Sequence, residues 1–177
     1  TRCGRDWSSD VCSSDLYTEN LIQKDNDDDA IVFYSEQQIK RKLSWIELRE
    51  NTNKLAYYFK KIGINTGDRI AGILPNIPET VISFLAVAKI GAIWSSCSAD
   101  FGPKAIIDRF KQIEPKILII SDYYFYNNKK IDTLSKIKDV LKELPSVIEV
   151  IIIPYNKEKG VSNCKFSHKK WYDLINN

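Results

Sequence analysis

The sequence predicts an α/β fold: a doubly wound, mostly parallel sheet with helices on both faces, preceded by a short β-hairpin. Between Arg69 and Ile153, short runs rich in Ile, Leu, Val and Ala alternate with longer stretches at helical spacing. The short runs show little polar alternation, which is typical of strands covered on both faces. Because single helices separate these strands, we expect the strands to run parallel with right-handed crossovers.

A hairpin and a helix are expected before this alternation. Ala30–Tyr34 is β-branched and aromatic, and Ile39–Leu43 alternates apolar with basic side chains, which predicts a hairpin with one face in water. Ser44 then begins a helix, because Glu47 three residues later completes a capping box for two free backbone N–H groups. Gly63 ends that helix.

The alternation itself predicts four strands and further helices. The strands are expected at Arg69–Leu74, Ala92–Cys97, Ile117–Ser121 and Val147–Ile153. The helices are expected at Pro78–Ile90, Pro103–Ile113 and Ile131–Leu144. A short helix is expected at Trp171–Ile175, with its tryptophan packed against the rest of the domain. Proline favours the first turn of a helix, because its missing N–H is not needed there. The first of these helices is apolar nearly all round, so it should lie buried.

The first sixteen residues differ from the rest of the chain. They hold no isoleucine and no lysine but two of the four cysteines, and Ser8–Val11 is nearly repeated by Ser13–Leu16. The chain also begins with Thr1 and contains no methionine. We therefore expect residues 1–16 to be a disordered stretch of translated adapter sequence, and residues 17–177 to be part of a longer domain.

Composition excludes several classes of function. The net charge of +3 comes from basic and acidic residues scattered along the chain, so no basic stripe indicates nucleic-acid binding. The longest apolar stretch, Val81–Ile90, is interrupted by Ser83 and Lys89 and is shorter than the ~20 residues of a membrane span. The cysteines form no CxxC pair and His168 is the single histidine, so we expect no metal site and no Ser/His/Asp triad. Lone thiols fit a reducing cytoplasm.

Ligands of open parallel sheets bind beyond the carboxyl ends of the strands. The ends predicted here are Pro75–Asn76, Ser98–Gly102 and Asp122–Lys130. The second of them enters a helix at Pro103, and the free N–H groups of a helix start can receive an anion. The alternative is that Ser98 or Asp100 merely caps this helix.

The third end, Asp122–Lys130, combines aromatic, amide and ammonium groups. Such a loop offers ring faces for an adenine and lysines for a phosphate; the alternative is an ordinary exposed loop. Neither GxGxxG nor GxxxxGK[ST] occurs in the chain, so neither glycine-rich phosphate-binding motif is present.

Several stretches resemble adenylate-forming, AMP-dependent acyl-CoA synthetases. The shared stretches are Tyr17–Leu21, Thr66–Gly72 and Pro75–Thr80. The runs Trp94–Gly102 and Arg109–Lys116 are more specific. Their residues resemble the sequences of the acetoacetyl-CoA synthetase branch of the family rather than those of the acetyl-CoA synthetase branch. Ala99 departs from the proline expected in that branch. The resemblance covers residues 17–175 and identifies 17–177 as a partial N-terminal AMP-binding domain.

The resemblance implies a two-step reaction in the complete enzyme. Acetoacetate attacks ATP to give acetoacetyl-adenylate and pyrophosphate, and the CoA thiol then displaces AMP; Mg²⁺ would neutralise the phosphates. The phosphate loop, the adenylate-binding segments and the catalytic lysine of the family lie beyond this chain. We therefore expect no catalytic residue here, no activity of the chain by itself and no tight binding of ATP, CoA or Mg²⁺. The remainder of the same polypeptide would be its partner, in the cytoplasm.

The resemblance also implies a CoA-binding edge. In related synthetases, the loops that match this region approach the CoA nucleotide, which carries over to Ser98, Ala99, Asp100 and Lys129. Acetyl-CoA synthetases have glycines at the positions of Ala99 and Asp100 and an arginine at that of Lys129. Lysine keeps the charge but loses the bidentate geometry of arginine.

Three other interpretations stay open at this point. One is an acetyl- or propionyl-type synthetase. Another is a stand-alone, flavodoxin-like module that binds a nucleotide or CoA. The last is a non-catalytic interaction domain.

Overall fold

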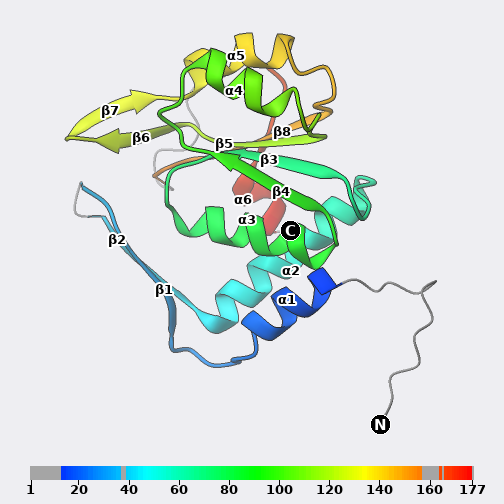
Figure 1. The fold of residues 1–177 in the computed structure, drawn as a ribbon. Helices are drawn as coiled ribbons and strands as arrows, with labels where there is room; N and C mark the ends of the chain where they lie inside the picture. Colours follow the sequence, from blue (N-terminus) through cyan, green and yellow to red (C-terminus); the bar gives the residue numbers. More distant parts are fainter. Residues whose placement is uncertain (1–12, 37–38, 157–163, 165, 177) are drawn as a thin grey trace.

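The computed structural model describes residues 13–36, 39–156, 164 and 166–176 (Figure 1). Its helices are α1 (Ser13–Leu21), α2 (Trp45–Lys61), α3 (Pro78–Lys89), α4 (Pro103–Phe110), α5 (Leu134–Lys142) and α6 (Trp171–Ile175). Its strands are β1 (Asp29–Tyr34), β2 (Lys40–Ser44), β3 (Arg69–Ile73), β4 (Ile93–Cys97), β5 (Ile117–Ser121), β6 (Tyr123–Tyr126), β7 (Lys129–Asp132), β8 (Glu149–Ile153) and β9 (Lys169–Lys170). No helix in the described part of the chain is both long and apolar enough to cross a membrane.

The central sheet has the strand order β4-β3-β5-β8-β9, with every neighbouring pair parallel. Ile70 of β3 lies in register with Trp94 of β4 on one side and with Ile117 of β5 on the other. Helices α4 and α5 cover one face of the sheet, and α2, α3 and α6 lie on the other (Figure 1). The hairpins β1–β2 and β6–β7 are antiparallel. This architecture confirms the predicted doubly wound α/β fold with a preceding hairpin.

Alternate side chains of the central strands enter two separate hydrophobic cores. In β5, Ile117 and Ile119 pack with α2 and α3, whereas Leu118 and Ile120 pack with α4 and α5. These four side chains are fully buried, because a doubly covered strand has no wet face. The edge strand β4 differs from this expectation, since Ile93 is 51% exposed.

Capping chemistry sets the start of α2 where the sequence predicted it. The Glu47 N–H donates to Ser44 Oγ at 3.2 Å, and the Ser44 N–H donates to Glu47 Oε2 at 2.9 Å, which confirms the capping box of α2. Gly63 follows α2 with a φ of +86°, a conformation that glycine adopts without steric cost. Trp171 of α6 is fully buried, as expected for a docked tryptophan.

Helix α1 begins at Ser13, four residues before the boundary expected at residue 17. The Thr18 hydroxyl donates to Leu85 O of α3 at 3.1 Å, and the Tyr17 ring packs edge-on against Phe84 at 5.7 Å. These contacts attach α1 to α3, and the first turn of α1 includes Ser13–Leu16. Residues 1–12 lie outside the described residues, and the origin of residues 1–16 stays a prediction.

The segment predicted as a loop at Asp122–Lys130 is instead mostly a hairpin, and α5 begins at Leu134 rather than at Ile131. Asn127 and Asn128 have φ values of +50° and +58° and form the two-residue turn between β6 and β7. Asparagine tolerates this left-handed conformation, which hairpin turns of this length require at both central residues. Pairing with β6 therefore takes Ile131 into β7 and delays the helix.

Candidate ligand cleft at the carboxyl edge of the sheet

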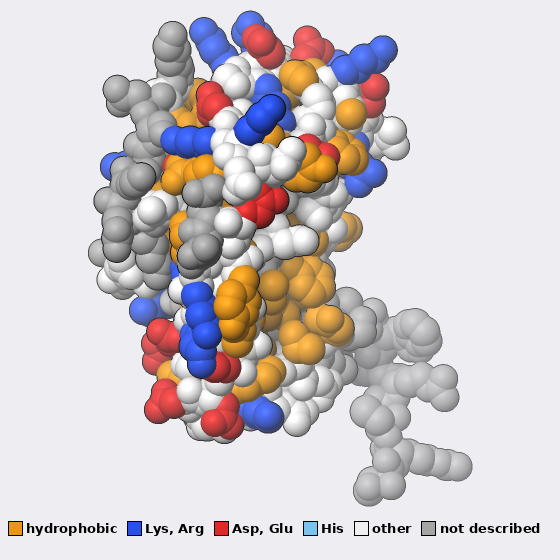
Figure 2. All heavy atoms as spheres, turned by 90° about the vertical axis from the view of Figure 1, so that its left-hand side faces the viewer, with side chains coloured by type: hydrophobic (Ala, Val, Ile, Leu, Met, Phe, Trp, Pro, Cys, Tyr) orange, Lys and Arg blue, Asp and Glu red, His pale blue; other side chains and the backbone are white. Residues whose placement is uncertain are grey.

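The three strand ends named from the sequence meet in one hollow of about 440 Å³, which we call the carboxyl-edge cleft. It is lined by Leu74, Pro75, Asn76, Thr80, Ser96, Cys97, Ser98, Ala99, Asp100, Tyr124 and Tyr126. Small-molecule sites typically have volumes of roughly 300–1,000 Å³, so the size is suitable for part of a nucleotide. Figure 2 views the side of the molecule at the left of Figure 1, where mainly uncharged side chains occupy the middle of the face.

The wall after β3 is a short turn into α3. The Thr80 hydroxyl donates to Pro75 O at 2.8 Å, and the Ile77 N–H donates to the same carbonyl at 2.9 Å. These two bonds satisfy the Pro75 carbonyl within the turn. Asn76 is exposed beside it, so its amide can face a ligand.

The floor is the turn Ser98–Gly102 after β4. Ala99 is 1% exposed, whereas Ser98 and Asp100 are exposed on either side of it. The Phe101 N–H donates to Ser98 O at 3.2 Å. The N-cap of α4 is Gly102, and no side chain in the described part of the chain caps this helix. The alternative that Ser98 or Asp100 is a capping residue is therefore wrong.

The third wall is strand β6. Tyr124 is buried and Tyr126 is 67% exposed. Burial, with a smaller contribution from the Asp100 carboxylate, raises the pKa of Tyr124, so its phenol stays neutral and can donate a hydrogen bond. The hairpin is fixed at its tip, because the Asn128 N–H donates to Glu36 Oε2 at 3.0 Å.

Lys129 is the one predicted site residue that does not line the cleft. It is exposed on β7 and pairs with Tyr126 across the hairpin, near the tip of β6–β7. The neighbouring Lys130 ammonium lies 3.9 Å from the centre of the Tyr123 ring. No lysine or arginine lines the described cleft, so its lining suits a base or sugar better than a phosphate.

The cleft lining includes the thiol of Cys97, which is not activated as a nucleophile. Burial raises the pKa of the Cys97 thiol to about 11, although Arg109 and Lys136 act in the opposite direction, so the thiol stays neutral.

His168 lines a separate hollow together with Ile148 and Glu149, at the amino end of β8. Among the residues that the structure describes, no group of His, Cys, Asp and Glu is suited to hold a metal ion.

The structure adds two cations that the sequence did not reveal. Lys136 of α5 donates to backbone carbonyls of the turn Ser98–Gly102, which we call the cleft turn. Arg109 of α4 donates from Nη1 to Ser96 O at 3.2 Å. Both side chains lie outside the lining of the cleft. Their sequence pattern is that of surface charges on helices, so only the tertiary contact identifies them.

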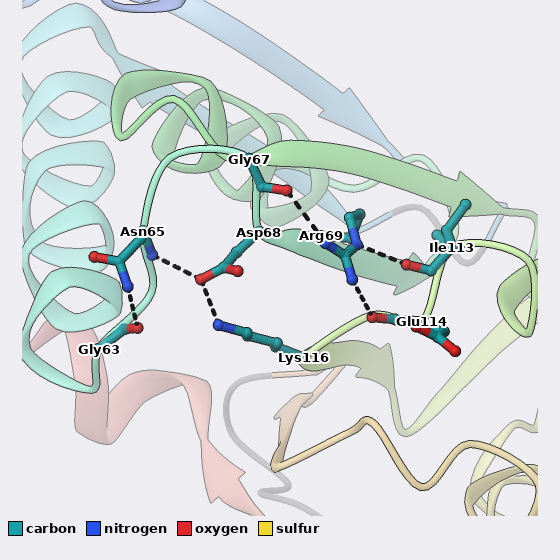
Figure 3. Close-up of polar contacts among 8 residues, drawn as sticks. All are labelled: Gly63, Asn65, Gly67, Asp68, Arg69, Ile113, Glu114 and Lys116. Carbon is teal, nitrogen blue, oxygen red and sulfur yellow. Dashed lines mark hydrogen bonds and ion pairs between the residues drawn. The ribbon is translucent and has the colours of Figure 1, made fainter.

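The stretch Thr66–Gly72 lies at the opposite, amino edge of the sheet (Figure 3). Asp68 Oδ2 accepts hydrogen bonds from Asn65 N and Lys116 Nζ, both at 2.8 Å. Arg69 donates from Nε to Ile113 O at 2.7 Å and from Nη2 to Glu114 O at 3.2 Å. These contacts join β3 to the start of β5 and the end of α4, so this stretch stabilises the fold and does not contribute to the cleft.

Comparisons with known proteins agree with the sequence resemblance. The chain is 44% identical over 139 residues to the acetoacetyl-coenzyme A synthetase of Rhizobium meliloti (strain 1021), covering 78% of this chain and 21% of that protein. It is also 44% identical over 142 residues to the acetoacetyl-CoA synthetase of Xenopus tropicalis, with the same coverage. The chain thus spans about a fifth of the length of these curated relatives.

A solved structure of acetoacetyl-CoA synthetase from Streptomyces lividans matches with a TM-score of 0.84 and 31% identity, over 93% of this chain and 25% of that one. The other interpretations, an acetyl- or propionyl-type synthetase and a stand-alone module, gain no support from these comparisons. The AMP-binding enzyme family matches residues 19–173, which confirms the predicted superfamily. The chain belongs to the AMP-binding enzyme family.

Proposed function

We propose that this chain is the N-terminal part of an ATP-dependent acetoacetate–CoA ligase. The complete enzyme would join acetoacetate to ATP as acetoacetyl-adenylate with release of pyrophosphate, and CoA would then displace AMP. The 44% identity over 139 residues to an enzyme named acetoacetyl-coenzyme A synthetase is the observation that carries this proposal. The unpaired thiols of Cys97 and Cys164 support a cytoplasmic location.

In this proposal the carboxyl-edge cleft receives the nucleotide end of CoA. The faces of Tyr124 and Tyr126 would contact the adenine ring, and the polar groups of Ser98 and Asp100 would contact the base and ribose. Ala99 keeps the floor closed, because it is buried. Lys129, exposed near the hairpin tip, would attract the phosphates that extend beyond the cleft.

ATP and Mg²⁺ fit the described residues poorly. The cleft lining has no cation to hold a triphosphate, and the described residues offer no acidic cluster for the metal. The neutral Cys97 thiol is unsuited to nucleophilic attack. We therefore assign to this chain the binding and orientation of CoA, and assign adenylate formation to the remainder of the polypeptide.

The test uses the complete ligase that contains this chain. We expect acetoacetate-dependent exchange of pyrophosphate with ATP, and a kcat/KM for acetoacetate at least about tenfold above those for acetate and propionate. A preference for acetate or propionate would overturn the acyl assignment. The 177-residue chain assayed alone should show neither pyrophosphate exchange nor acyl-CoA formation.

Two substitutions test the CoA assignment. Lys129→Ala and Tyr126→Ala should each raise the KM for CoA about five- to tenfold, because they remove a charge and a ring face from the nucleotide. Pyrophosphate exchange, which needs no CoA, should be unchanged. The matched control is Lys138→Ala, an exposed lysine of α5 outside the cleft. An unchanged KM for CoA in both cleft variants would remove CoA from this edge.

A further inference from the structure

Lys136 of α5 connects two parts of the chain through the backbone of the cleft turn. Its ammonium donates to Ala99 O at 2.5 Å and to Phe101 O at 2.7 Å. The two acceptors come from alternate residues of the turn, so a single cation fixes both sides of Asp100. Charged donors make stronger hydrogen bonds than neutral ones, and here one side chain makes two of them.

Lys136 is partly buried, and a second cation holds the same segment of the chain. The side chain is half-buried, and burial lowers the pKa of its ammonium, while Cys97 and Asp100 act in the opposite direction. Arg109 adds a second attachment, because its Nη1 donates to Ser96 O and its guanidinium lies 5.7 Å from the centre of the Phe101 ring. Cations from two helices thus hold the segment that leaves β4.

The direction of these bonds determines what the turn presents. A trans peptide group is planar, with its C=O and N–H pointing in opposite directions. Because the carbonyls of Ala99 and Phe101 point at Lys136, the N–H groups of Asp100 and Gly102 point away from it. Lys136 is not part of the cleft lining, whereas Ala99 and Asp100 are.

We propose that Lys136 is a positioning residue of the carboxyl-edge cleft, which fixes the turn Ser98–Gly102 in the conformation that receives the ligand. That the ligand is CoA rests on the proposed function; that Lys136 orders the turn does not. Without the ammonium, two carbonyls lose their donors and the turn samples other orientations, so its backbone is no longer preorganised for the nucleotide.

The first measurement is amide hydrogen exchange on the full 177-residue chain. Lys136→Met keeps the aliphatic length but removes the donors, and the Phe101 amide, which donates to Ser98 O within the turn, should then exchange at least about tenfold faster, with the amides of β5 and β8 unchanged. Lys138→Met, on the same helix, should leave these rates as they are. Lys136→Arg, which keeps the charge and several donors, should restore protection to within about threefold.

Unchanged exchange of the Phe101 amide in Lys136→Met would overturn the proposal. So would faster exchange of equal size throughout β5 and β8, because the lysine would then stabilise the whole fold and not the turn. If Lys136→Met does not fold, Lys136→Gln is measured with the same expected pattern, and a uniform effect there has the same adverse meaning.

The second measurement separates this proposal from the proposed function. In the complete ligase, Lys136→Met should raise the KM for CoA about tenfold with pyrophosphate exchange unchanged, and Lys136→Arg should recover most of that loss. If Lys129→Ala and Tyr126→Ala raise this KM and Lys136→Met does not, the positioning role is wrong and the CoA site stands. If the turn loosens but no cleft variant changes the KM for CoA, the positioning role stands and the CoA assignment is wrong.

Discussion

Arg41 and Glu79 join the β1–β2 hairpin to α3 through two parallel hydrogen bonds, from Nη1 to Oε1 at 2.7 Å and from Nη2 to Oε2 at 2.9 Å. The Glu79 residue is 4% exposed, and the Tyr172 hydroxyl of α6 donates to its Oε1 at 3.3 Å. The glutamate of the Pro75–Thr80 stretch thus holds three elements together. Glu79 is not part of the cleft lining, so its role in this structure is to connect these elements.

Removal of the arginine from this pair should be costly. Arg41→Met leaves the Glu79 carboxylate buried without its cation, which we expect to lower the free energy of unfolding by about 3 kcal/mol. Urea unfolding of the 177-residue chain measures the change. The neighbouring pair of Lys42 and Asp29 is exposed, so Lys42→Met is the matched control and should change stability little. Equal effects of the two substitutions would contradict this role of Arg41.

Gly72 of β3 should resist substitution because the Trp94 indole covers it. A Cβ at Gly72 would lie 2.6 Å from Trp94 Cη2 and 2.7 Å from Cζ2, closer than carbon atoms can approach. We expect Gly72→Ala to destabilise the fold by about 1–3 kcal/mol, measured by thermal unfolding. The smaller ring in Gly72→Ala/Trp94→Phe should recover part of this loss.

Gly102→Ala is the stability control for that experiment. Gly102 has a φ of −69°, and the Cβ of an alanine at this position would have no described atom within 4 Å beyond the neighbouring residues. Its substitution should therefore have little effect on the melting temperature. A Gly72→Ala variant as stable as wild type would show that Trp94 moves aside at no cost.

The regular elements of the fold were predictable because local signals specified them. Ser44 and Glu47 mark the start of α2 by their own hydrogen bonds, and Pro78 marks the first turn of α3, so neighbouring residues suffice to predict these bounds. The β6–β7 hairpin was missed, although Asn127-Asn128 between aromatic and basic runs is a signal for a two-residue turn. The same segment mixes aromatic, amide and ammonium groups, a composition that is also typical of a loop.

The candidate site was predictable in part, for a different physical reason. Parallel strands end at one edge, so the meeting of Asn76, Ser98 and Tyr124 in one cleft follows from topology alone. The contact of Lys136 with Ala99 does not follow, because it joins residues 37 positions apart that only the packed fold brings together. Lys129 lies on β7 and outside the lining of the cleft, so its contact with CoA stays a prediction.

Arg69 should stabilise the amino edge of the sheet. Its guanidinium satisfies the carbonyls of Ile113 and Glu114 beyond α4, where Glu114 has a φ of +46° (Figure 3). Arg69→Met removes these two donors, together with the longer contact from Nη1 to Gly67 O at 3.5 Å, at a partly exposed site, so we expect a loss of about 1–2 kcal/mol in urea unfolding. Arg69→Lys should recover less than half of the loss, because an ammonium cannot match the spacing of both bonds. Lys104→Met, at an exposed position of α4, is the control, and a loss as large there would refute the assignment.

Asp122, which follows β5, should make stability depend on pH in an unusual direction. Asp122 is 1% exposed. Its Oδ1 accepts from the N–H groups of Tyr123 and Tyr155 at 2.8 Å each, and its Oδ2 has no hydrogen-bond partner among the described residues. Burial raises the pKa of this carboxyl above the value of about 3.9 for an unfolded chain. The protonated form is therefore favoured by folding, and the stability it contributes is present below the unfolded pKa and is lost as pH rises through the folded pKa.

Asp122→Asn keeps the Oδ1 acceptor and removes the titration, so it isolates this effect. As pH falls from about 7 to about 4, the wild-type chain should gain free energy of unfolding relative to Asp122→Asn, because only the wild type takes up the proton. Asp139→Asn is the control with the opposite sign, since the hydrogen bond from Lys142 lowers the pKa of Asp139 and its contribution is lost as pH falls. Guanidinium unfolding of the three proteins at matched pH values measures both differences. If the difference between wild type and Asp122→Asn is flat, or runs parallel to that of Asp139→Asn, the buried carboxyl is already compensated in the folded chain.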